Sequence, residues 1–268
     1  MKQADEMADI SEDYQGIVNA RENGVRSILG VSVEVLSRHQ AVELIANNIE
    51  TDKHEKYAFL NAHGANIACE NSEFRDVLHQ FMVLSDGIGV DLASRILYGQ
   101  SFPANLNGTD FIPALLSKLE PGTHIALLGA QQGVAESAIV NLQSVYSHLK
   151  FSVVHDGFFD VAEEQLILDR LSQDKPDVLL VAFGNPRQEK WIAEHITSDH
   201  VSVVFGVGAL FDFIAERVPR APQFLISLRL EWLYRLALEP GRMWRRYILG
   251  NPVFMFRVLK QKMFGEKN

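Results

Sequence analysis

From residue 123 onward, short uninterrupted apolar runs alternate with segments of helical periodicity, and this alternation limits the possible folds more than any other feature. The apolar runs are HIALLG (124–129), FSVVHD (151–156), DVLLVAFG (177–184) and VSVVFGVG (201–208). Such runs predict strands covered on both faces, and the segments between them predict helices at 134–149, 162–172 and 188–195. The series predicts an α/β fold with a Rossmann-like parallel sheet core.

The first half of the chain is less regular but contains the same kinds of segment. It predicts strands at 56–63 and 81–87, and helices at 65–79 and 90–97. We expect the two halves to pack as one catalytic unit with a cleft between them. Ligands of doubly wound sheets bind at the carboxyl ends of the strands, so we expect a site among the loops that follow the strands. These loops begin at Gly129, His155, Gly184 and Gly206.

The two ends of the chain differ from this body. Residues 1–27 are acidic and lack the basic start and apolar run of a secretion signal, so they are interpreted as a flexible leader. Residues 28–222 are expected to form the catalytic domain, and residues 223–268 a helical, basic appendage.

The appendage carries the opposite charge to the rest of the chain. Residues 1–216 hold 14 Lys and Arg against 31 Asp and Glu, whereas residues 217–268 hold 11 against 3. The acidic body argues against nucleic acid as a partner, and the basic, aromatic tail favours an anionic membrane or a phosphate, although a solvated helix face would have the same composition. Pro240, Gly250 and Pro252 predict that the tail is divided into short helices.

Cysteine content and apolar segments predict the compartment. The single cysteine, Cys69, excludes an intrachain disulfide, which is typical of a reducing compartment. The longest apolar window, 201–215, is too short to span a bilayer and contains Asp212. We expect a cytoplasmic protein without a transmembrane helix, and the sequence leaves homo-oligomerisation open.

Two glycines lie where the first strand of the second half meets its helix. Gly129 and Gly133, in LLGAQQG, would let the backbone approach a phosphate at the helix N-terminus. A tight turn between strand and helix would require the same glycines. The segment is neither a full GxGxxG motif nor a P-loop.

A polar cluster follows the third strand of the second half. FGNPRQEKW places Asn185, Arg187, Gln188 and Glu189 on a loop at the carboxyl end of that strand, which favours recognition of a polar ligand. Alternatively, Gln188 and Glu189 only begin and cap a helix.

A carboxylate ends the strand expected at 81–87. Asp86 in SDGIGVD is a candidate general base that would remove a proton from a hydroxyl nucleophile. The alternative is a turn in which the carboxylate binds only nearby backbone.

Metal chemistry has little support in the sequence. HExxH is absent, the nine histidines are scattered, and no Asp-x-Asp motif is present, so we expect neither a metal nor another cofactor. Bound phosphates would then be held by arginines of the tail, because one guanidinium group can donate two parallel hydrogen bonds to phosphate oxygens. The candidates are Arg235, Arg242, Arg245 and Arg246.

Six segments occur in an order that resembles the WecG/TagA/CpsF glycosyltransferase family, over roughly residues 28–250. The segments are FLNAHGANIA, LSDGIGVDLASRILYGQSFPANLNGTDF, LLGAQQGVAESA, FGNPRQEKWI, GVGALFDFIAERVPRAPQF and EWLYRLALEPGRMWRRY.

The resemblance implies an inverting, metal-independent transfer of a sugar from a UDP-sugar donor to a polyprenyl-diphosphate-linked saccharide acceptor, at the inner face of the bacterial cell membrane. It implies that Asp86 is the catalytic base, that Asn61 lines the same pocket and that Gln188 helps to hold the donor sugar. Asn107, in NLNGTDF, is a further expected substrate contact. The tail resembles the family's peripheral membrane-docking appendage, whose arginines complete the site.

Two segments indicate which branch of the family the chain resembles. Residues 59–63 lack the Thr-Pro-Asn-Pro-Glu-like stretch of teichoic-type members, and NLNGTDF also departs from the usual form. Both are more similar to the xanthan-type branch, so we expect transfer of a hexose, such as glucose, in exopolysaccharide or capsule biosynthesis. The alternative is transfer of N-acetylmannosamine, or its uronate, to an N-acetylglucosaminyl diphosphate lipid.

Two functions from other classes are more remote. The doubly wound sheet also suits a nucleotide-dependent oxidoreductase or epimerase, which the missing GxGxxG motif disfavours. The basic tail also suits a noncatalytic membrane-binding adaptor.

Overall fold

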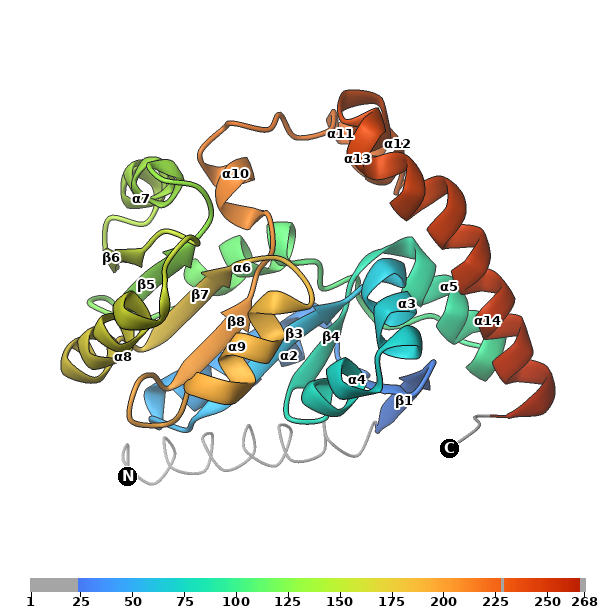
Figure 1. The fold of residues 1–268 in the computed structure, drawn as a ribbon, viewed down its shortest axis with the longest axis horizontal. Helices are drawn as coiled ribbons and strands as arrows, with labels where there is room; N and C mark the ends of the chain where they lie inside the picture. The colour runs from blue at the N-terminus through green and yellow to red at the C-terminus, as the bar shows by residue number, and fades with distance from the viewer. Residues whose placement is uncertain (1–23, 228, 266–268) are drawn as a thin grey trace, which may run out of the picture.

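The computed structural model describes residues 24–227 and 229–265, without the side chains of residues 227 and 242. Its centre is a parallel sheet with the strand order β4-β3-β8-β7-β5-β6 (Figure 1). The strands are β3 (Glu55–Leu60), β4 (Met82–Ser85), β5 (His124–Gly129), β6 (Lys150–His155), β7 (Val178–Ala182) and β8 (Val203–Gly206). A separate antiparallel hairpin joins β1 (Val25–Ile28) to β2 (Val31–Glu34). The expected Rossmann-like sheet is confirmed.

The central strands β7 and β8 are apolar throughout because helices cover both faces of the sheet. On β3, Tyr57 and Phe59 join one buried cluster, and Ala58 and Leu60 join the other. The first face is covered by α2 (Arg38–Glu50), α6 (Gly108–Leu116), α7 (Val134–Val145) and α10 (Leu210–Ile214). The second is covered by α3 (Ala62–Glu70), α4 (Ser72–Leu78), α5 (Gly87–Tyr98), α8 (Val161–Asp174) and α9 (Arg187–His195).

Several boundaries in the body differ from the sequence prediction, since the strand expected at 56–63 ends at Leu60 and residues 62 and 63 already belong to α3. The helix expected at 65–79 is two helices, because Asn71 ends α3 and its side chain caps α4 by accepting the backbone N–H of Phe74 at 3.0 Å. The leader expected at 1–27 overlaps β1, which begins at Val25. Residues 1–23 lie outside the described part of the chain.

The C-terminal appendage contains α11 (Gln223–Ser227), α12 (Glu231–Leu238), α13 (Pro240–Trp244), a π-helical turn η1 (Arg245–Leu249) and α14 (Gly250–Phe264). The expected break at Gly250 and Pro252 is wrong, since helical structure runs without interruption from Pro240 to Phe264. Pro252 lies in the first turn of α14, directly after the π-helical turn η1, where the regular α-helical hydrogen-bond pattern is interrupted.

The appendage lies along the edge of the body (Figure 1). Phe254 and Val258 of α14 are buried in the second core cluster, against α3 and α5. Farther along, Gln261 accepts the backbone N–H of Leu29 at 3.0 Å and donates to the carbonyl of Ser27 at 3.2 Å. None of the helices in the described residues is both long and apolar enough to cross a membrane.

Candidate active site

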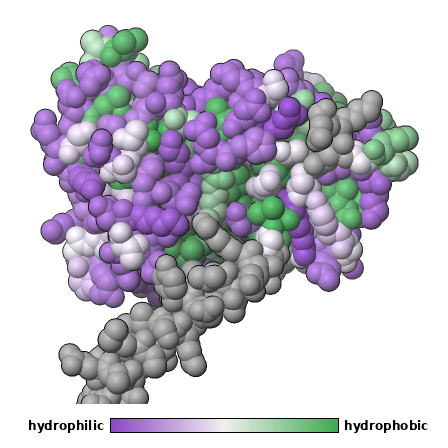
Figure 2. Space-filling model, turned by 90° about the horizontal axis from the view of Figure 1, so that it is seen from below, coloured by the Kyte–Doolittle hydropathy of each residue, from purple (hydrophilic) through white to green (hydrophobic). Residues whose placement is uncertain are grey.

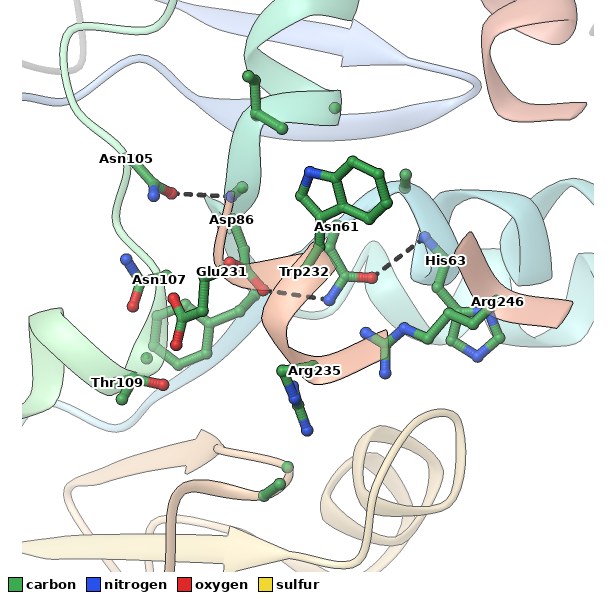
Figure 3. Close-up of a pocket in the computed structure, with 18 of the residues that line it drawn as sticks. Asn61, His63, Asp86, Asn105, Asn107, Thr109, Glu231, Trp232, Arg235 and Arg246 are labelled. Carbon is green, nitrogen blue, oxygen red and sulfur yellow. Dashed lines mark hydrogen bonds between the residues drawn. The ribbon is translucent and has the colours of Figure 1, made fainter. Parts of the chain in front are cut away.

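A cavity of about 1090 Å³ lies at the carboxyl ends of β3, β4, β7 and β8, between the body and the appendage. Polar side chains from four regions far apart in the sequence meet in it (Figure 3). They come from the segments after β3, β4 and β7 and from the appendage, and include Asn61, Asp86, Asn185, Gln188, Arg235 and Arg246. Both halves of the body line this cavity, as expected for a cleft between them, and the appendage forms one wall of it.

Asn61 directly follows β3 and is the N-cap residue of α3. Its Oδ1 accepts the backbone N–H groups of His63 and Gly64, both at 3.1 Å. These two bonds fix the orientation of the amide, so its Nδ2 is directed at Asp86 and donates to Oδ2 at 3.1 Å (Figure 3). The helix cap thus sets the geometry of the carboxylate.

Asp86 directly follows β4, and its backbone N–H donates to the carbonyl of Leu60 at 2.9 Å. It is the N-cap residue of α5, yet its side chain makes no capping hydrogen bond. Oδ1 of Asn105 accepts the neighbouring Gly87 N–H at 2.8 Å instead. The alternative in which this carboxylate binds only local backbone is therefore not the arrangement of the folded protein.

Burial raises the pKa of Asp86, against the opposing effects of the Asn61 hydrogen bond and the positive charges of Arg246 and Arg235. A carboxylate with a raised pKa holds an accepted proton more strongly than an exposed one. This favours removal of a proton from a bound hydroxyl group.

Three arginines of the appendage line the cavity: Arg235 from α12, and Arg245 and Arg246 from η1. The guanidinium group of Arg235 lies 5.1 Å from the ring centroid of Phe213, and its Nε is buried without a hydrogen-bond partner among the described residues. Stacked guanidinium groups around a cavity suit an anionic ligand. Arg242 lies in α13, and the structure does not describe its side chain.

Gln188 connects the loops that follow β7 and β8. Its Oε1 accepts the backbone N–H of Gly184 at 3.1 Å and that of Gly208 at 3.0 Å. A Cβ atom at Gly206 would lie 2.8 Å from its Nε2, so only glycine leaves room for this side chain. Gln188 lines the cavity in a fixed orientation.

Glu189 lies beneath the cavity and is fully buried. Its Oε1 accepts hydrogen bonds from Asn185 at 2.7 Å and from Gln188 at 2.8 Å. Burial raises its pKa to about 7. The structure thus places Glu189 as a support for two cavity-lining amides and not in the lining itself.

Other expected site residues have different surroundings. Arg187 is exposed outside the cavity, with its guanidinium group 4.9 Å from the ring centroid of Phe183. Gly129 does not line the cavity either, because β5 lies farther along the sheet; a Cβ atom there would lie 2.7 Å from the Ala182 carbonyl oxygen. Close strand packing therefore accounts for this glycine.

Asn107 lines the cavity as the N-cap residue of α6. Its Oδ1 accepts the backbone N–H of Asp110 at 3.0 Å, and its Nδ2 donates to the carboxylate of Asp110 at 2.9 Å. Half of its hydrogen-bonding capacity, one acceptor position and one N–H, is therefore used within the helix cap.

The structure also brings residues into the cavity that sequence reasoning did not select: His63, Asn105, Glu231 and Trp232. His63 and Asn105 are polar residues near a strand end and a helix start, which is a signal too common to single them out. Burial and the nearby Arg246 lower the pKa of His63, which favours its neutral form. Among the described residues, no group of three or more His, Cys, Asp or Glu side chains is arranged to hold a metal ion.

A carboxylate at a strand end, facing arginines from a C-terminal appendage across a cavity, suits transfer of a group attached to a phosphate. The comparison with protein families identifies the class, because a model described as the glycosyl transferase WecG/TagA/CpsF family matches residues 26–268. The chain belongs to this family and is a glycosyltransferase.

Three bacterial relatives are each named N-acetylglucosaminyldiphosphoundecaprenol N-acetyl-beta-D-mannosaminyltransferase. The Bacillus subtilis (strain 168) protein is 32% identical over 240 residues, which cover 89% of each chain. The Bacillus spizizenii (strain W23) protein is 31% identical over 202 residues, 75% of this chain and 77% of the relative. The Staphylococcus aureus (strain NCTC 8325) protein is 30% identical over 251 residues, 91% of this chain and 96% of the relative. The resemblance to the family is confirmed, whereas these relatives do not support the xanthan-type branch.

Proposed function

We propose that this chain is an inverting glycosyltransferase that transfers N-acetylmannosamine from a UDP-sugar to a polyprenyl diphosphate carrying N-acetylglucosamine. The names of the relatives support this donor sugar and acceptor over the hexose transfer expected from the sequence. The observation that carries the proposal is the meeting of Asp86 with the arginines of the appendage in one cavity.

In the proposed reaction, the carboxylate of Asp86 takes the proton from an acceptor hydroxyl group as its oxygen attacks the anomeric carbon. The bond between that carbon and the UDP oxygen breaks, and the configuration at the carbon inverts. Negative charge develops on the leaving diphosphate. Arg235, Arg245 and Arg246 are placed to stabilise it, as groups already oriented in the folded protein.

The supports beneath the cavity suit this mechanism. Gln188 is held by two backbone N–H groups and by Glu189, so it can present its remaining amide hydrogen to a donor sugar. Asn61 holds Asp86 in one orientation. Residues oriented in this way need little reorganisation during the reaction.

The appendage is proposed to bring the enzyme to the cytoplasmic face of the membrane. More than half of the exposed large hydrophobic side chains of the described residues lie between positions 224 and 264, among them Phe256, Met263 and Phe264. The face of the protein seen from below is mainly hydrophilic, with hydrophobic residues in small separate groups (Figure 2). Basic residues beside exposed apolar side chains favour an anionic lipid surface.

A matrix of substrates tests the proposed function. The purified protein is incubated with UDP-N-acetylmannosamine or UDP-glucose, and with a polyprenyl diphosphate that carries N-acetylglucosamine or glucose. We expect a product, identified by mass, only from the first donor with the first acceptor, and equal activity in a metal chelator. Glucose transfer to the glucosyl acceptor would instead establish the hexosyltransferase. No transfer in any combination would contradict the proposal.

A further inference from the structure

Glu231 brings a carboxylate of the appendage into the cavity, which the body lines with Asp86 and Asp110. It is the first residue of α12 and lines the cavity together with Asn107 and Thr109. In Figure 3 its side chain lies on the Asn107 and Thr109 side of Asp86, whereas Arg246 lies on the opposite side, next to His63. Body and appendage thus both provide carboxylates to the same space.

Glu231 differs from the other carboxylates near the appendage in having no partner. Asp110 pairs with Arg220 and with Asn107, and Asp91 pairs with Arg229 at 2.6 Å. Within the described part of the chain, the side chain of Glu231 has neither a hydrogen bond nor an ion pair.

The surroundings of Glu231 also disfavour its charged form. Burial raises its pKa, Asp110 and Asp86 raise it further, and Arg220 and Arg235 oppose them. Withdrawing a carboxylate from water without hydrogen bonds is unfavourable. The carboxylate can recover this free energy when a ligand offers hydroxyl or amide hydrogens to it.

The charges around the cavity indicate which part of a ligand lies there. Phosphate groups are attracted to Arg235, Arg245 and Arg246 and repelled by Glu231, so the carboxylate side suits a neutral, hydroxyl-rich group. The attacking sugar must lie beside Asp86, whose charge raises the pKa of Glu231. That sugar belongs to the acceptor, which the proposed membrane-bound appendage would deliver.

On the basis of the proposed function, we propose that Glu231 binds the acceptor sugar, accepting hydrogen bonds from its hydroxyl or N-acetyl N–H groups and orienting the attacking hydroxyl toward Asp86. Glu231 therefore determines acceptor recognition, whereas Asp86 takes the proton. Since α12 carries Glu231, the acceptor site is complete only when the appendage is docked.

The test uses the full chain with the variants Glu231→Ala and Glu231→Gln. Glu239→Gln is the matched control, because Glu239 is the other carboxylate in the described part of the appendage and does not line the cavity. The measurements are steady-state KM and kcat for each substrate, UDP affinity by calorimetry, and affinity for a soluble N-acetylglucosaminyl diphosphate with a short alkyl chain.

For Glu231→Ala we expect about a 10- to 100-fold rise in acceptor KM and a matching loss of analogue affinity, since a charged hydrogen-bonding partner is lost. Glu231→Gln, which keeps one acceptor oxygen, should fall between Glu231→Ala and the wild type. UDP affinity and donor KM should stay within about twofold in both variants, and Glu239→Gln should behave as the wild type.

Three results would overturn the inference: unchanged analogue affinity in Glu231→Ala, an equal loss of UDP and analogue affinity, or a fall in kcat with unchanged acceptor KM. Wild-type protein that fails to bind the analogue would also overturn it. If the analogue binds and Glu231→Ala weakens it, but no sugar is transferred from any donor, the proposed function fails while this inference stands.

Discussion

The body and the appendage are stabilised in different ways. In the body, strands such as β7 are buried along their whole length between two layers of helices. In the appendage, α12 and η1 contain no buried residue, and α14 buries only Phe254 and Val258. Its remaining contacts include side-chain bonds such as Arg257 to Glu70 at 2.7 Å and Lys262 to the carbonyl of Leu97 at 3.1 Å.

This difference shows how the site depends on the two parts. The body folds around its own core and holds Asp86, Asn61 and Gln188 in place. The appendage contributes Glu231 and the arginines, but exposed ion pairs each contribute less than about 1 kcal/mol. Its docking therefore relies on many small contacts, and any ligand that binds only the docked form would strengthen it.

Asp86→Asn tests the contribution of the body to catalysis and is expected to have the largest effect. We expect transfer to fall by about 100- to 10,000-fold, because the amide cannot take the proton, while the oxygen that accepts from Asn61 is retained. UDP affinity should stay unchanged. Turnover near the wild-type level would remove Asp86 from the role of base. In the wild type, activity should rise with pH through an apparent pKa above 3.8, since burial raises the pKa of this group.

Arg235→Ala tests the appendage's part of the same cavity. We expect about a 100-fold lower kcat, since one group that stabilises the developing charge is lost. Arg187→Ala is the control, because Arg187 is exposed and lies outside the cavity. An equal fall in kcat in Arg235→Ala and Arg187→Ala would show that Arg235 contributes no more to catalysis than an exposed arginine outside the cavity.

The exposed apolar residues of α14 are expected to matter only for the membrane. Replacing Phe256, Met263 and Phe264 with serine should lower cosedimentation with anionic vesicles by about tenfold or more. Activity on a soluble acceptor should be unchanged, because these side chains are exposed and do not line the cavity. Serine at Val140 and Val145, exposed on α7, is the control and should leave vesicle binding intact. If both sets of variants bind equally well, membrane docking through α14 is wrong.

The smallest effect is expected for Glu189→Gln, which should change the pH dependence of stability. Its pKa of about 7 lies above the usual value, so the folded state favours the protonated form. The resulting stabilisation is complete below about pH 4.5 and is lost as the pH rises to about 7. Glu189→Gln removes this dependence, so its Tm should change less than that of the wild type over this range. Parallel curves of Tm against pH would show that Glu189 is not buried as a neutral acid.

The sequence by itself determined the six strands of the sheet and most of the helices between them, but not the β1–β2 hairpin, α2 or α6. Strands buried on both faces must be continuously apolar, and helices with one buried face must be periodic, so both patterns can be read locally. It also placed Asp86 at the end of a strand and Gln188 in the segment that follows another, whereas Asn61 was expected inside a strand and was selected only through the family resemblance. The break at Asn71 was missed, because the capping role of a single asparagine depends on the chain that follows it.

Only the tertiary structure decided which of these residues share a cavity. The strand order separates Gly129 from Asp86, and the fold places Glu189 beneath the amides that it supports. In the appendage, α12 ends before Glu239 and η1 is π-helical, so no single helical period relates Arg235 to Arg245 and Arg246. Strand order and docking depend on contacts between distant segments, and a local sequence pattern contains no information about them.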